Sequence, residues 1–295
     1  MKLTLFKEKV NLEEDIKNRT EYIGGSDIGV IMGCNPWKSA YTLWAEKTGL
    51  IEPDNLDDVE SVWWGQQEEE LVAKRFTMKT GLKVKKANFA FQCKEYPYLR
   101  GHVDRIASKG KWGIECKTTS AFNKTDYEGG DVPPMHYWQC MFYMCLTGAD
   151  HWYLCTKRNN NEFHIIQIDR DEEVIKQMLD ACETFWKHVT DGTPPEVDGS
   201  SSTTETLKEV YSIEASEPFT VDLSAAESEI VAIGVIKDKL REAEMIKKKY
   251  ENTIKALMQE HTYGESENYI VTWKADSRGA RILRIKEKVK EKENV

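Results

Sequence analysis

The chain has 295 residues, of which 40% are hydrophobic and 10% aromatic, so it can build a core for one large domain or two ordinary ones. Its net charge of −9 and isoelectric point of about 5.4 argue against binding polyanions over the whole surface, but they leave room for a locally basic groove. The seven cysteines form no CxxC pair, which disfavours zinc sites, iron–sulfur clusters and a disulfide framework.

Helical and strand patterns alternate from the N-terminus to about residue 190. Two helices are predicted first, each closed by a glycine, over residues 39–49 and 61–81. Three strands follow, over residues 82–93, 98–108 and 111–118. The series ends with a helix over 133–148, strands over 150–157 and 162–170, and a helix over 171–189. This order predicts an α/β fold with a mixed central sheet flanked by helices.

The remainder of the chain has a different pattern. Glycine, proline and serine are frequent around residue 200, so we expect a core over 1–200, a linker or loop over 201–221 and an extension over 222–295. The extension reads as one long helix followed by a β-hairpin. Its helix carries a heptad-like apolar seam interrupted at Lys247. We expect this helix to dock on its own domain, with a partner or a second copy as the alternative.

Polar side chains fall on faces of the core that should be buried. Glu69 shares a helical stripe with Val72, and Gln139 shares another with Phe142. Asp104 lies within the predicted second strand. Because a buried carboxylate without a partner costs several kcal/mol, each acid should have one.

Glu115 and Lys117 lie two residues apart on the next predicted strand, so their side chains share a face. An ion pair on a wet sheet face would explain them, and so would half of a metal site. Asp104 and Glu69 would bring further carboxylates, which repel one another unless a cation bridges them. Oxygen ligands suit Mg²⁺ or Mn²⁺, and Lys117 could orient or deprotonate a water. The pattern predicts a phosphodiesterase centre.

Several stretches occur together in an order typical of one family: 19–49, 64–81, 99–106, 113–120 and 133–148. With them, residues 15 to 160 resemble the YqaJ-type viral recombinases, relatives of the phage lambda exonuclease within the PD-(D/E)xK nuclease superfamily. The resemblance implies a restriction-endonuclease-like core. It also implies a phage or prophage enzyme that uses Mg²⁺ to digest duplex DNA from 5′ to 3′, leaving 3′ single-stranded overhangs for recombination.

The resemblance assigns the metal site residue by residue. Asp104 and Glu115 match the family's metal-binding carboxylates, and the backbone carbonyl of Cys116 matches a further ligand. Lys117 matches the catalytic lysine. Two Mg²⁺ ions in each active site are implied, and Mn²⁺ could replace them.

Further matches surround this centre. Glu69 and Gln139 match active-site residues on two helices, and Arg19 and Ser26 match residues that hold the 5′-phosphate. A glycine-rich turn with a hydroxyl and an arginine suits a phosphate, because backbone N–H groups approach closely while the guanidinium binds two oxygens. Ser26 could instead cap a helix, and Arg19 could form a surface ion pair.

Two positions depart from the family pattern. His102 stands where the exonuclease has a small hydroxyl residue, and Lys124 takes the place of an arginine. Both are counted with the 5′-phosphate site. The resemblance assigns no role to residues 222–295.

The remaining expectations concern binding partners, location in the cell and alternative functions. The resemblance implies double-stranded DNA ends as substrate, a single-strand annealing protein as partner, and a homotrimeric ring that encircles DNA. The N-terminal residues lack the apolar stretch of a signal peptide, and no segment approaches the ~18 apolar residues of a membrane span, so we expect the bacterial host cytoplasm and no membrane. A structure-specific or nonspecific endonuclease on the same fold, or a DNA-end-binding scaffold without nuclease activity, are the alternatives.

Overall fold

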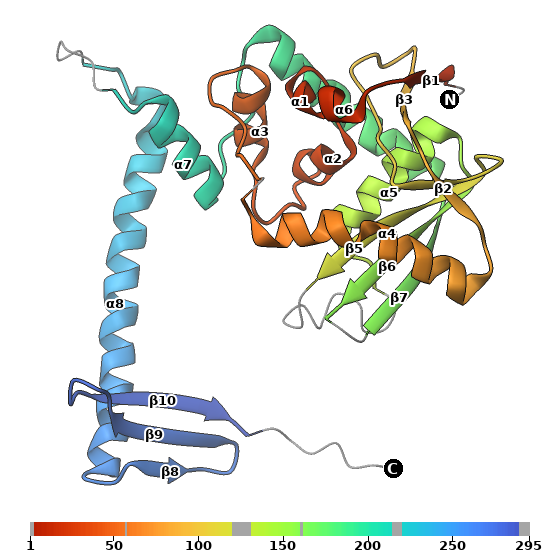
Figure 1. The fold of residues 1–295 in the computed structure, drawn as a ribbon. Coiled ribbons are helices and arrows are strands. Elements are labelled where there is room, and N and C mark those ends of the chain that lie inside the picture. The colour runs from red at the N-terminus through yellow and green to blue at the C-terminus, as the bar shows by residue number, and fades with distance from the viewer. Residues whose placement is uncertain (1–2, 57, 120–130, 160–161, 214–219, 289–295) are drawn as a thin grey trace. The chain divides into compact units, whose positions relative to one another are not determined.

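The computed structural model describes residues 3–56, 58–119, 131–159, 162–213 and 220–288 (Figure 1). They form two compact units, which divide between Glu214 and Ala215. Within the described residues, no helix has the length and apolar character needed to cross a membrane.

A five-stranded mixed sheet is the centre of the first unit. Its order is β2-β4-β5-β6-β7, with β5 and β6 parallel and the other pairs antiparallel. The strands are β2 (Val84–Lys86), β4 (Arg105–Ala107), β5 (Trp112–Thr119), β6 (His151–Arg158) and β7 (Glu162–Asp169). A second, two-stranded sheet pairs β1 (Leu5–Lys9) with β3 (Phe89–Cys93). The mixed sheet predicted from the sequence is confirmed.

Helices cover both faces of the five-stranded sheet (Figure 1). On one face, α4 (Glu60–Thr80) packs Val72, Ala73 and Phe76 against Ile114 of β5. The other face is covered by the crossover helix α5 (Pro134–Thr147), which contacts α6 (Glu172–Asp191). The smaller helices of the unit are α1 (Leu12–Lys17), η1 (Arg19–Glu21), α2 (Gly25–Ile31), α3 (Ala40–Lys47) and α7 (Ser201–Val210).

The alternation along β5 decides which residues meet which helix. Ile114 faces α4, so its neighbour Glu115 points to the α5 side. Gly113 has no room for a side chain, because a Cβ there would lie 2.3 Å from the Trp152 ring and 2.7 Å from the backbone oxygen of Arg105. β5 therefore packs closely against both neighbouring strands directly before Glu115.

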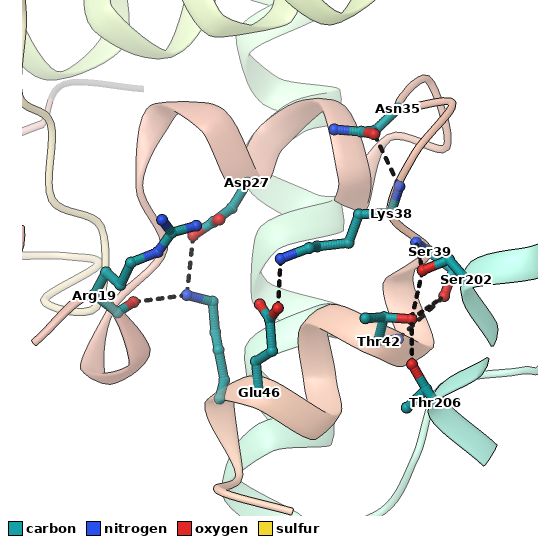
Figure 2. A network of polar contacts seen from close by, with 10 residues as sticks. Arg19, Asp27, Asn35, Lys38, Ser39, Thr42, Glu46, Ser202 and Thr206 are labelled. Atoms are coloured by element: carbon teal, nitrogen blue, oxygen red, sulfur yellow. Dashed lines mark hydrogen bonds and ion pairs between the residues drawn. The ribbon is translucent and has the colours of Figure 1, made fainter. Parts of the chain in front are cut away.

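The prediction of a linker or loop over residues 201–221 is wrong in its first half, where α7 forms. Ser200 caps this helix by accepting a hydrogen bond from the Thr203 amide at 3.1 Å. The Thr42 hydroxyl of α3 lies 2.8 Å from that of Thr206 and 2.7 Å from that of Ser202 (Figure 2). The hydroxyl-rich sequence is typical of a loop, but here its hydroxyls bond to α3.

The second unit contains a long helix and a small antiparallel sheet. After η3 (Ser224–Ala226) come α8 (Glu227–Met258), β8 (Tyr263–Glu265), β9 (Tyr269–Ala275) and β10 (Arg281–Glu287). The hairpin β9–β10 confirms the prediction, and β8 adds a third strand beside β9. Within the second unit, Met258 is the one buried residue among those described in α8, and the docking of this helix on its own domain stays a prediction.

Candidate active site

Glu115 and Lys117 project together from β5 toward the α5 side. Glu115 is 2% exposed, and its Oε1 lies 2.7 Å from Lys117 Nζ. Its other oxygen, Oε2, is buried and has no hydrogen-bond partner. The ion pair therefore satisfies only half of this carboxylate.

Asp104 lies at the bend that precedes β4 and reaches the same strand. The Cys116 amide donates a hydrogen bond to Asp104 Oδ2 at 2.7 Å, which ties the aspartate to the backbone between Glu115 and Lys117. Burial raises the pKa of Asp104 well above its usual value, and the charges of Glu115 and Glu69 raise it further. Two carboxylates thus share a site that is short of positive charge.

Lys117 supplies part of that charge. Burial alone would lower the pKa of Lys117, but the neighbouring carboxylates of Glu115 and Asp104 raise it overall. The side chain is a cation held at the site by its ion pair with Glu115.

The donor set fits a hard divalent cation. Glu115 Oε2 is an orphaned buried oxygen, and the negative charges of Asp104 and Glu115 outnumber the one charge of Lys117. Oxygen ligands are those that Mg²⁺ and Mn²⁺ prefer. Among the residues that the structure describes, no three His, Cys, Asp or Glu side chains converge closely enough to hold an ion by themselves. A cation here would need further oxygens from backbone, water or phosphate.

Arg105 was not identified in the sequence, although it organises one side of the site. It is 4% exposed and makes ion pairs with Glu69 and, at 2.7 Å, with Glu70 Oε2 on α4. It also donates a hydrogen bond to the Asp104 carbonyl oxygen at 2.7 Å. The partner expected for Glu69 therefore exists and is an arginine. Its one sequence signal is its place beside Asp104, on the opposite face of the strand.

The Gln139 side chain forms a hydrogen bond within its own helix, α5. Its Nε2 donates a hydrogen bond to the Tyr143 hydroxyl at 2.8 Å. Burial raises the pKa of Tyr143, and the charges of Glu115 and then Asp104 raise it further, so this hydroxyl stays protonated near the carboxylates. Gly25 must be a glycine, because a Cβ there would lie 2.6 Å from the Tyr143 hydroxyl.

His136 is a second residue that the sequence did not reveal. It lies on the first turn of α5, and its Nδ1 is buried without a hydrogen-bond partner. Burial, together with the charge of Lys117, lowers its pKa to about 3. The imidazole is therefore neutral beside the lysine.

Arg19 begins η1, and Ser26 lies in the first turn of α2. Ser26 is exposed, and the helix N-cap is Gly24, so the capping role considered for Ser26 is wrong. The cap is completed by Asp27, which accepts from the Gly24 amide at 2.9 Å and pairs with Lys47 at 2.9 Å. Lys47 also donates to the Arg19 carbonyl oxygen at 2.9 Å. No carboxylate in the described residues pairs with the Arg19 guanidinium, which leaves it available.

His102 belongs to a cluster around Asp15. Its Nε2 lies 2.7 Å from Asp15 Oδ2, which also accepts from Arg100 Nε at 2.6 Å. Burial lowers the pKa of His102, and the Asp15 charge only partly offsets this. The Tyr22 ring lies 6.1 Å from the His102 ring and 5.9 Å from the Arg100 guanidinium. Lys124 lies outside the described residues.

The profile of the YqaJ-like viral recombinase domain matches residues 16–150, which span β5 and the turn before α2. A protein of Bacillus subtilis (strain 168), described as uncharacterized protein YqaJ, is 34% identical over 270 residues, 90% of this chain and 84% of its own length. The chain belongs to the YqaJ family. This match is longer than the first unit, so it extends into the second unit of the YqaJ-family chain.

Solved structures share the fold of this YqaJ-family chain. The alkaline exonuclease LHK-Exo from Laribacter hongkongensis superposes with a TM-score of 0.53 and 16% identity, over 61% of this chain and 93% of its own. The same enzyme in complex with dAMP superposes with a TM-score of 0.53 and 17% identity over the same shares. The first unit has the PD-(D/E)xK nuclease fold that the sequence predicted.

Proposed function

We propose that this chain is a metal-dependent deoxyribonuclease that digests linear duplex DNA from its 5′ ends and leaves 3′ single-stranded overhangs. The observation that carries the proposal is the half-buried Asp104 beside the buried Glu115, with Asp104 tied to β5, Lys117 on one Glu115 oxygen and no hydrogen-bond partner on the other. Two neighbouring carboxylates that share one lysine favour the binding of a further cation together with a phosphate.

The metal would be held by Asp104, Glu115 and the backbone carbonyl of Cys116. Mg²⁺ is the ion we propose, with Mn²⁺ as a substitute and two ions in each site. When bound, such an ion supplies Lewis-acid stabilisation of the phosphate and lowers the pKa of a water.

The chain's own residues would prepare this chemistry. The Cys116 amide holds Asp104 in place, and Glu115 holds Lys117 beside the shared site. Lys117 would orient the attacking water and stabilise negative charge that develops on the phosphate. His136, being neutral, adds no second positive charge that would repel Lys117. Glu69 would act through its ion pair with Arg105, and Gln139 through its hydrogen bond to Tyr143.

End recognition is proposed for the region around Tyr22. The free Arg19 guanidinium and the exposed Ser26 hydroxyl would bind the 5′-phosphate. His102 lies beside the Tyr22 ring but is engaged with Asp15, so we expect it to act through that carboxylate. We propose a phage-encoded enzyme in the bacterial cytoplasm that acts with a single-strand annealing protein. The homotrimeric ring that the family resemblance implies stays a prediction.

The test is digestion of linear and covalently closed circular duplex DNA, each with Mg²⁺ and with a chelator. The proposal expects Mg²⁺-dependent loss of the linear duplex, with release from labelled 5′ ends before 3′ ends and an intact circle. Cleavage of the circle would instead identify an endonuclease. Binding to ends without any digestion would identify a scaffold.

A further inference from the structure

The helix α8 exposes an apolar seam. Ile233, Ile236, Leu240 and Tyr250 are 53%, 54%, 62% and 63% exposed. Near its C-terminus the helix turns to its own sheet, where Met258 is buried and lies 3.7 Å from a Cβ built on Gly264. An exposed apolar stripe of this length marks an interaction surface.

The spacing of the seam is that of a coiled coil. Its positions alternate steps of three and four residues, which are the a and d positions of a heptad: Ile233, Ile236, Leu240, Ala243, Lys247 and Tyr250. Among the other exposed apolar residues of α8, Ile230 and Ile246 flank the seam at e and g positions and Leu257 continues it at a d position, whereas Val231, Val235 and Met245 lie at f, c and f. A straight helix that keeps a strict seven-residue repeat presents its seam best to another helix with the same repeat.

We propose that this seam binds the α8 of a second copy of the chain, parallel and in register. Charge favours this occupant. Lys239 lies at a g position and Glu244 at the following e position, so each Lys239 meets Glu244 of the other copy in a parallel pair. Lys239 makes no ion pair with any described residue of its own chain. The interaction is repeated on both sides of the pair by symmetry.

Lys247 is the one charged residue among these seam positions. In a parallel pair it faces the same lysine of the other copy, which costs stability but specifies the register. Each Lys247 lies 3.4 Å from Glu244 of its own helix, and this pair moderates the repulsion. The proposal does not depend on nuclease activity.

Cysteine cross-linking of the full chain tests the geometry. Ile236→Cys and Tyr250→Cys each place a thiol at a d position, where a parallel in-register pair brings identical residues together. Asp238→Cys and Asn252→Cys are matched controls, because each lies two residues further on, at an f position on the outer face. Under mild oxidation, both d variants should form disulfide dimers well above the level of the parent, and both controls should not.

The outcomes separate the alternatives. No cross-linking at either d position, or cross-linking at the f positions to the same extent, would overturn the proposal. Cross-linking at only one d position would indicate an antiparallel or shifted pair and would also overturn it.

Substitutions within the seam give a second test, because one should weaken the pairing of the two helices and another should strengthen it. In the Ile236→Cys chain, Leu240→Asp should raise the concentration needed for half-maximal cross-linking by about a hundredfold, because two buried leucines are lost. Lys247→Leu should lower that concentration by about tenfold, whereas Lys248→Leu, at the b position, should leave it unchanged. If Lys247→Leu and Lys248→Leu behave alike, the seam assigned here is wrong.

Discussion

The candidate active site and the helix α8 leave their side chains unsatisfied in opposite ways. In the active site, Glu115 is buried and one of its oxygens has no hydrogen-bond partner. On α8, Leu240 and Ile236 are more than half exposed. A buried carboxylate oxygen without a hydrogen-bond partner and an exposed apolar seam both raise the free energy of the chain on its own. Each is explained by a component that the chain itself does not contain.

The comparison also indicates what each component must be. A buried carboxylate oxygen without a hydrogen-bond partner is costly, and Asp104 and Glu115 share one lysine, so a cation that enters the site would stabilise it. Leaving a leucine side chain exposed loses about 1.5–3 kcal/mol of burial free energy, so an apolar surface of matching length would stabilise the seam. A cation bound together with a phosphate meets the first need, and a second α8 meets the second.

The largest effect is expected for Lys117→Ala, which should slow DNA digestion by about 10²–10⁴-fold. The ammonium would act on water and developing charge, so the variant should still bind Mg²⁺ and DNA. Single-turnover digestion and a calorimetric Mg²⁺ titration measure the two properties. The control is Lys111→Ala, an exposed lysine that lies 3.7 Å from Asp150. Loss of Mg²⁺ binding in folded Lys117→Ala protein would contradict the role assigned to the lysine.

Asp104→Asn should stabilise the metal-free protein by about 1–4 kcal/mol at neutral pH, because it removes a buried charge that lacks a cation. The folded-state pKa of Asp104 is raised, so the folded chain binds the proton more tightly than the unfolded chain does. Its destabilising effect is therefore absent below the unfolded pKa of about 4 and grows as pH rises through the folded pKa. Thermal unfolding in chelator across this pH range measures the difference between variant and parent.

Two controls sharpen this test. Asp150→Asn, at an exposed aspartate, should leave stability nearly unchanged across the same range. Added Mg²⁺ should stabilise the parent and not Asp104→Asn. A variant that is less stable than the parent at neutral pH in chelator would show that Asp104 is already compensated within the chain.

Arg19→Ala should remove a preference for 5′-phosphorylated duplex over 5′-hydroxyl duplex, which we expect to be roughly tenfold because a charge-assisted contact is lost. Ser26→Ala should reduce the same preference less, because its hydroxyl is neutral. Digestion rates of the two substrates are compared for each variant. Equal slowing of both substrates by Arg19→Ala would mean that the arginine is a structural or general DNA contact.

The smallest effect is expected on α8. Leu240→Gln should change the free energy of unfolding by less than about 0.5 kcal/mol at concentrations where the chain is monomeric, because the side chain is exposed and glutamine is a comparable helix former. Leu154→Ala, in the fully buried core, should lose about 2–5 kcal/mol under the same conditions. A loss of more than about 2 kcal/mol for Leu240→Gln would show that the seam packs within its own chain.

The residues of β5 could be predicted because their relation is local. The two-residue periodicity of a strand puts Glu115 and Lys117 on one face, whatever surrounds the strand. In the structure, Lys117 Nζ lies 2.7 Å from Glu115 Oε1. The long helix and the hairpin of the second unit followed from equally local periodicity. The fold class followed from the order of such elements.

Interactions between distant segments could not be predicted in this way. Arg105 pairs with Glu69, which is 36 residues away, and nothing local distinguishes it from a surface arginine. His102 meets Asp15 through the folding of the N-terminal segment. The sequence predicts a loop for the hydroxyl residues around Thr203, because their partners lie in α3 and at its N-cap, more than 150 residues earlier.

The most direct test of the nuclease site is Mg²⁺-dependent digestion of linear duplex DNA by the parent and by Glu115→Gln. This substitution keeps the shape of the side chain but removes the charge that pairs with Lys117 and would bind the cation. The account predicts that the parent digests the duplex only with a divalent cation, and that Glu115→Gln is slower by more than about a thousandfold while remaining folded. A Glu115→Gln enzyme with nearly the parent's rate, or a parent that is equally active in chelator, would contradict it.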